Sequence, residues 1–259
     1  MNVKVPAVAL AIILAAVCLT RPLHAHKGVT SKFTYNAEVY PIFLNRCGHC
    51  HVEGGVGPMS LLSYADAFPW AESLRTELLE TEGPSADAAT NFVKTAHREL
   101  PARELDMILD WATGGHPEGD HAKAPAPAKL INAWTHGEPH LGVPLPTPYL
   151  MPADVMEATQ EFVLPIGVTT SGDANAIDVL PGTPSIVREV ALQLRSGNTA
   201  PRPLGVWTPR QNPAPIVLNP PVDLLPGSHL VVRIHYKKTW VFEGRPMTDR
   251  SIFGLYLAP

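Results

Sequence analysis

Proline is the residue whose placement most restricts how this chain can fold. The chain has 28 prolines in 259 residues, about twice the usual share. Proline has no amide hydrogen to give to a helix or a central strand. A proline-dense stretch therefore predicts a connector without regular structure, with one folded unit on each side of it. Such a stretch runs from His116 to Pro152 and contains Pro117, Pro125, Pro127, Pro139, Pro144, Pro146 and Pro148.

The segment before the connector has helical patterns. Candidate helices cover Tyr35–Arg46, Tyr64–Glu80 with an interruption at a proline, and Pro101–Thr113. The last of these has apolar residues at the i, i+3, i+4 and i+7 positions counted from Leu105, which is the pattern of a buried helix face. Gly114 and the glycine after it end the pattern.

The segment after the connector has a different pattern. Short runs rich in β-forming residues are separated by glycines and prolines, which predicts an antiparallel sandwich. These runs are Glu161–Leu164, Ala176–Leu180, Ile186–Leu194, His229–Tyr236 and Ile252–Leu257.

Charge divides along the same boundary. Residues 26–122 carry 7 Lys and Arg against 14 Asp and Glu, whereas residues 123–259 carry 11 against 10. The net charge of -4 argues against nucleic-acid binding, which needs a basic face. The acidic helical half favours a redox protein partner with a basic docking face.

The first 25 residues have the pattern of a secretory signal peptide. Lys4 precedes an apolar run from Val5 to Leu19, and Leu23-His24-Ala25 is a suitable cleavage site. The run is shorter than the roughly 20 residues that span a bilayer. We therefore expect a periplasmic or otherwise exported protein with no membrane span after signal removal. Cys18 leaves with the signal, so that Cys47 and Cys50 are the two cysteines of the mature chain.

Those two cysteines belong to the sequence Cys47-Gly48-His49-Cys50-His51, which is the C-x-x-C-H attachment motif of c-type haem. Thiols one helical turn apart can form thioethers with the two vinyl groups on one edge of a porphyrin. The adjacent His51 then lies under the ring and can ligate the iron on its proximal side. The motif predicts one covalent haem c held by Cys47, Cys50 and His51.

Three other uses of the two cysteines were weighed. A thioredoxin-like redox pair needs a βαβ context, which the helical surroundings do not offer. A structural zinc site needs a second pair of ligands at zinc spacing, and no further cysteine remains. A disulfide across two intervening residues is strained. Haem attachment is the interpretation that agrees with export.

The sixth iron ligand stays open at this point. His97 lies four residues before Pro101, where a small haem domain presents its distal ligand ahead of the last helix. Met59 follows the motif closely, and Met107 lies within the last candidate helix. An open distal site would permit peroxide chemistry. We expect His97 as the distal ligand, with Met59 as the alternative.

The sequence also resembles the cytochrome c domain, and the first β domain after it, of bacterial copper type II, ascorbate-dependent monooxygenase-like proteins. The resemblance implies a cytochrome c fold followed by a jelly-roll-like domain. The stretches that carry it are Cys47–Trp70, Pro101–Gly119, Trp134–Glu138, Phe162–Gly167, Pro181-Gly182, Leu224–Tyr236 and Asp249–Ala258.

Two departures from the family pattern concern copper. The family places a His-His pair where this chain has Arg188-Glu189, and arginine does not ligate copper. His235-Tyr236 is retained, but the sequence has no counterpart of the family's second, catalytic copper domain. His229 and His235 would face the same side of one strand, where they form either a weak metal site with Glu189 or ordinary strand positions. We expect no copper.

Together these observations predict a multidomain chain with an all-α cytochrome c-like domain followed by an all-β jelly-roll-like sandwich. The expected divisions are a signal peptide (1–25), a haem domain (26–120), a Pro-rich connector (121–152) and a β-sandwich domain (153–259). The expected function is an exported monohaem cytochrome that transfers single electrons, with the sandwich as a docking or assembly module. The alternatives are a peroxidase-like haem oxidoreductase or an accessory part of a copper monooxygenase system, and a subunit of a larger redox complex. An electron carrier is favoured over a stand-alone enzyme.

Overall fold

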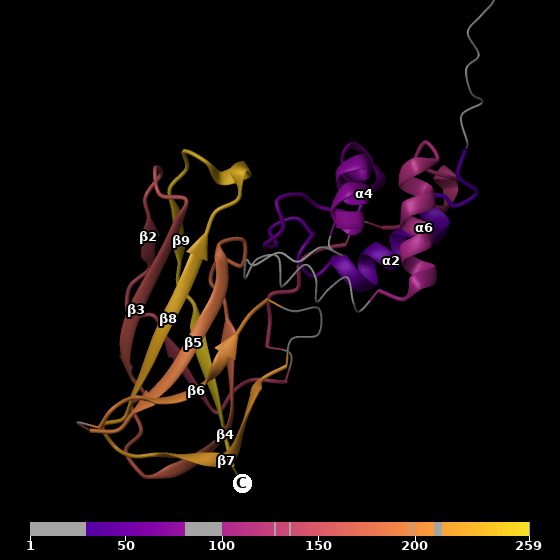
Figure 1. Cartoon of the computed structure of the whole chain (residues 1–259). Coiled ribbons are helices and arrows are strands. Elements are labelled where there is room, and N and C mark those ends of the chain that lie inside the picture. The colour runs from indigo at the N-terminus through magenta and orange to yellow at the C-terminus, as the bar shows by residue number, and fades with distance from the viewer. Residues whose placement is uncertain are drawn as a thin grey trace, which may run out of the picture.

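The computed structural model describes residues 30–80, 100–126, 128–134, 136–197, 199–209 and 214–258 (Figure 1). The expected signal peptide, residues 1–25, and the expected distal ligand His97 lie outside the described residues. In Figure 1 the helices lie to the right of the strands, which form the larger part of the molecule.

One helical segment ends at the first cysteine of the motif. It consists of a π-helical turn, η1 (Tyr35–Val39), a short α-helix, α2 (Tyr40–Ile42), and a second π-helical turn, η2 (Phe43–Cys47). The carboxylate of Glu38 accepts hydrogen bonds from the amide (2.8 Å) and the hydroxyl (3.2 Å) of Thr34. This contact satisfies a backbone group at the start of the segment and fixes where the helix begins.

The other helices up to residue 123 are short, and local side chains set the limits of the first ones. The hydroxyl of Ser63 accepts a hydrogen bond from the Asp66 amide (3.1 Å) and caps the first of them. Pro69 then converts the middle of the expected helix Tyr64–Glu80 into a single 3₁₀ turn. The helices are α3 (Tyr64–Ala67), η3 (Phe68–Trp70), α4 (Ala71–Glu80), α6 (Ala102–Thr113) and η4 (His121–Lys123).

The expected fold class, an all-α cytochrome c-like domain followed by an all-β jelly-roll-like sandwich, is wrong. The described chain is mostly β, with three sheets, and its short helices do not build a long all-α domain. Helix-breaking residues are the physical reason. Residues 48–63 contain four glycines and a proline and form turns and bends in place of a helix, and Pro69 shortens the next helix.

Two four-stranded antiparallel sheets make up most of the structure. One has the strand order β1-β10-β4-β7 and the other β3-β8-β5-β6, while β2 and β9 form a separate pair. The strands are β1 (Leu141–Pro144), β2 (Tyr149–Met151), β3 (Glu157–Pro165), β4 (Gly172–Leu180), β5 (Val187–Arg195), β6 (Arg202–Trp207), β7 (Ile216–Leu224), β8 (His229–Lys237), β9 (Met247–Asp249) and β10 (Ile252–Leu257), with the 3₁₀ turn η5 (Trp240–Phe242) before β9.

The prediction that the chain from His116 to Pro152 lacks regular structure is also partly wrong. Strands β1 and β2 both fall within it. Strand β1 lies at the edge of its sheet, where one side of the strand needs no hydrogen-bond partner, so Pro144 is tolerated there.

The described residues bury two separate hydrophobic clusters. The first gathers side chains between Tyr35 and Ala112, and the second lies between the sheets, from Val143 to Leu255. Among the described residues, several contacts link the sandwich to the helical segments or to the connector. Arg188 donates to the Val56 carbonyl, the side-chain amide of Asn132 donates to the Pro181 carbonyl (2.8 Å), and the rings of Trp70 and Trp240 lie 6.0 Å apart.

Candidate haem-attachment site

The two cysteines and the histidine of the motif lie on one turn of backbone. The amides of Cys50 (3.1 Å) and His51 (2.9 Å) both donate to the carbonyl of Cys47. Gly48 makes this turn possible, because a Cβ at its position would lie 2.8 Å from the Leu44 carbonyl oxygen. The backbone therefore presents both thiols and the imidazole from a single short segment.

The ring of His51 is held by one of its two nitrogens. Its Nδ1 lies 3.2 Å from the carbonyl oxygen of Met59, and because a carbonyl only accepts, Nδ1 is the donor. The lone pair is then on Nε2, which is the tautomer that a metal-binding histidine needs. Burial lowers the pKa of His51, which also favours the neutral imidazole.

A tight loop wraps around the His51 backbone and ring. The amide of Gly57 donates to the Cys50 carbonyl (2.8 Å), and the amide of Leu61 donates to the His51 carbonyl (2.9 Å). A Cβ at Gly57 would lie 2.7 Å from Nδ1 of His51, and a Cβ at Gly55 would lie 2.5 Å from the Cys50 carbonyl oxygen. Only glycine allows the loop to approach the motif this closely.

Both thiols are free and half-buried. Burial, with the neighbouring Cys50 as the next cause, raises the pKa of Cys47 to about 12. Burial raises the pKa of Cys50 to about 11, against the lowering effect of the Arg188 charge. Both sulfurs are therefore protonated at neutral pH in their half-buried positions.

A cluster of buried aromatic side chains is connected to the motif by hydrogen bonds. Trp111 and Tyr35 are fully buried, and their ring centroids lie 6.1 Å apart. The hydroxyl of Tyr35 donates to the Leu61 carbonyl (2.9 Å). Since the amide of Leu61 holds the carbonyl of His51, the cluster is connected to the ligand through one residue.

The structure gives the candidate sixth ligands different surroundings. The carbonyl of Met59 contacts Nδ1 of His51, and the Met59 side chain packs against the hydrophobic cluster between Tyr35 and Ala112. Met107 packs against the same cluster from α6, and His97 lies outside the described residues.

The histidines of β8 share one face of their sheet, as their even spacing predicts, and this is the outer face. His235 faces Glu189 across the β5–β8 pair, but its Nε2 contacts Glu157 of β3 at 2.9 Å. His229 pairs with Arg195 at the far end of the same strand pair. The structure thus does not bring His229, His235 and Glu189 together. Within the described ranges, no group of three or more His, Cys, Asp or Glu side chains is placed to hold a metal ion.

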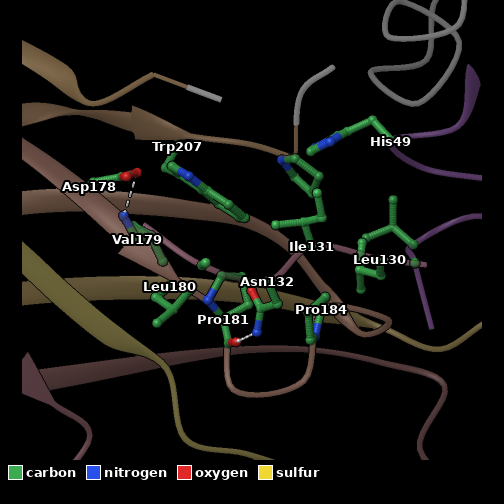
Figure 2. A pocket seen from close by; sticks show the side chains of 14 residues that line it. His49, Leu130, Ile131, Asn132, Asp178, Val179, Leu180, Pro181, Pro184 and Trp207 are labelled. Carbon is green, nitrogen blue, oxygen red and sulfur yellow. Dashed lines mark hydrogen bonds between the residues drawn. The ribbon is translucent and has the colours of Figure 1, made fainter. Parts of the chain in front are cut away.

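A small pocket lies between the motif segment and the sandwich (Figure 2). His49 and Trp207 face it from opposite sides, and the connector residues Leu130, Ile131 and Asn132 lie along it. Its volume of about 70 Å³ is far below the roughly 300–1,000 Å³ of typical ligand pockets. It marks an imperfectly packed contact between the two parts and does not have room for a porphyrin.

The residues present fit haem c. Two reduced thiols and a histidine with a free Nε2 come from one turn, and two glycines keep the loop clear of the ring. The sequence predicts Cys47, Cys50 and His51 as attachment residues, and this stays a prediction. It does not reveal the Met59 carbonyl, Gly57 or Arg188 as neighbours of the motif. The signals in the sequence are a glycine-rich spacing and an arginine where the resemblance would place a histidine.

Comparisons with protein-family models, with curated proteins and with solved structures find no match. The resemblance to the copper monooxygenase-like proteins stays an expectation. No helix among the described residues is long and apolar enough to cross a membrane.

Proposed function

We propose that this protein is an exported electron carrier with one haem c covalently attached at Cys47 and Cys50. The observation that carries the proposal is the hydrogen bond from Nδ1 of His51 to the Met59 carbonyl. This bond leaves Nε2 as the free nitrogen beside two reduced thiols. A histidine that only filled space would not need a fixed tautomer.

Each residue of the motif has a separate task. The thiols of Cys47 and Cys50 would each add across a vinyl double bond, so that a C–S bond would form and the thiol hydrogen would go to the neighbouring vinyl carbon. Nε2 of His51 would ligate the iron, and the Met59 carbonyl keeps the imidazole in place. When bound, the haem supplies a one-electron change between ferric and ferrous iron.

The charge distribution supports a partner of opposite sign. Residues 26–122 carry twice as many acidic as basic side chains. On α4 the side chains of Glu72, Glu77 and Glu80 are exposed. A basic face on a redox partner would be attracted to this half of the chain and oriented by it. The sandwich would then act as a docking or assembly module.

Covalent haem is the decisive test. The full chain is produced with its signal in a bacterial host that matures c-type cytochromes, and haem is measured by pyridine haemochrome. We expect one haem c per chain in the periplasmic fraction. Cys47→Ser and Cys50→Ser each remove one thioether, which shifts the haemochrome band toward that of a haem with one free vinyl group.

His49→Ala is the matched control, because His49 lies inside the motif but is neither a thiol nor the ligand. It should retain the full haem content. A wild-type chain without covalent haem refutes the proposal. A high-spin ferric spectrum that changes rapidly with peroxide would instead favour the peroxidase-like alternative.

A further inference from the structure

Strand β5 contains an irregularity at the point nearest the motif. Val187 pairs with Tyr236 of β8 and Glu189 pairs with His235, so Arg188 is an extra residue without a partner across the strand pair. The inward-facing residues of β5 are otherwise Val190, Leu192 and Leu194, and this alternation would point residue 188 into the core. The bulge turns Arg188 outward, and bulges that redirect one side chain are frequent beside functional sites.

The redirected side chain reaches the motif loop. Nη1 of Arg188 donates to the carbonyl of Val56 at 2.5 Å. Val56 directly precedes Gly57, which lies against the His51 ring and donates to the Cys50 carbonyl. Arg188 therefore holds the loop at the residue next to its closest approach to the expected iron ligand.

The guanidinium also brings a positive charge to the motif. The guanidinium is close enough to both Cys50 and Glu157 to interact with them electrostatically, and although burial lowers the pKa of Arg188, an arginine keeps its charge at neutral pH. Within the part of the chain that the structure describes, no carboxylate forms a salt bridge with Arg188. Its field at the motif is therefore only partly offset by Glu157.

We propose that Arg188 is a positioning residue of the haem site, which fixes the Val56–Gly57 loop against His51 and whose charge favours the ferrous over the ferric state. The inference rests on the proposed haem attachment. Ferric haem carries one more positive charge than ferrous haem, so a nearby cation disfavours oxidation. The sandwich would then tune the redox centre directly, in addition to serving as a docking module.

Two variants of similar length separate this effect from simple packing. Arg188→Lys keeps a positive charge and a donor for the Val56 carbonyl, whereas Arg188→Met keeps much of the side-chain volume and removes both. Arg195→Gln is the control, because it removes a charge from the other end of β5, about 23 Å away at 3.3 Å per residue. Each is compared with wild type by haemochrome, by reductive titration and by the low-spin ferric spectrum.

We expect Arg188→Met to bind haem but to shift the equilibrium toward ferric iron by about tenfold, which is about 59 mV for one electron. Arg188→Lys should remain close to wild type, as should Arg195→Gln. In the haem-free protein, Arg188→Met should also speed hydrogen exchange at the Gly57 amide. A haem-loaded Arg188→Met with the wild-type potential, or equal shifts in the Lys and Met variants, overturns this inference alone. A wild-type chain without haem overturns the proposed function and this inference with it.

Discussion

The contact between Gly57 and the imidazole of His51 leads to a prediction that can be worked out from the structure. In Gly57→Ala the new methyl group would lie 2.7 Å from Nδ1 of His51 and 2.9 Å from the Cys50 carbonyl oxygen. An ordinary contact begins at 3.4 Å, so the loop or the ring has to move by about 0.7 Å. Gly57 is not among the described glycines with positive φ, so the effect is one of space and not of backbone strain.

The expected cost follows from two terms. Overpacking of this kind costs about 1–3 kcal/mol. Separation of Nδ1 from the Met59 carbonyl removes a hydrogen bond worth about 0.5–1.5 kcal/mol. We expect Gly57→Ala to lower the free energy of unfolding of the haem-free protein by about 2 kcal/mol, measured by urea denaturation. In the haem-loaded protein the displaced imidazole should weaken the low-spin ferric spectrum.

Gly172→Ala is the matched control for this substitution. Gly172 lies at the start of β4, and a Cβ there meets nothing within 4 Å. The unfolding free energy of the Gly172→Ala variant should stay within about 0.5 kcal/mol of wild type, or rise slightly because alanine restricts the conformations of the unfolded chain. Equal stability and equal spectra for the two alanine variants would refute the argument that the loop packs against the ligand.

Four further substitutions test the sandwich and its contact with the helical part. Tyr236→Phe removes the buried hydrogen bond to Asp249 (3.0 Å) and should lower the free energy of unfolding by about 1–2 kcal/mol in urea. Burial raises the pKa of Asp178, so the folded protein loses stability as pH rises through that raised pKa. Asp178→Asn should therefore be more stable than wild type at pH 7 and lose this advantage below about pH 4, where the carboxyl is protonated in both states. Trp70→Ala and Trp240→Ala should show a coupling energy of about 0.5–1.5 kcal/mol in a double-mutant cycle, and additive effects would mean that their ring contact does not join the two parts.

Elements with strong local periodicity were predictable from the sequence. The expected helix Pro101–Thr113 corresponds to α6 (Ala102–Thr113), and the run Ile252–Leu257 is β10. The helix repeats apolar residues at the helical period, and β10 is a short continuous apolar run that is buried along its middle, so local pattern and burial agree in both. The all-α assignment was wrong because three separate helical patterns were extended to a whole domain, although Pro69 and the glycine-rich residues 48–63 interrupt them.

The candidate haem site was predictable only in the residues whose spacing is dictated by the chemistry of haem attachment. Thioether attachment requires two cysteines a turn apart and an adjacent histidine, and these are visible in the sequence. The carbonyl of Met59 carries no side-chain signal, because every residue has one. The bulge at Arg188 depends on how β5 pairs with β8, which no pattern within β5 reveals.

The order of the strands also has a consequence for biosynthesis. Strand β10 is formed by nearly the last described residues, yet it lies between β1 and β4 and pairs with both. That sheet cannot be completed until β10 has been synthesised. The motif at residues 47–51 is synthesised some 200 residues earlier. If haem is attached as proposed, the thiols are therefore accessible for an interval before the finished sandwich closes on their loop.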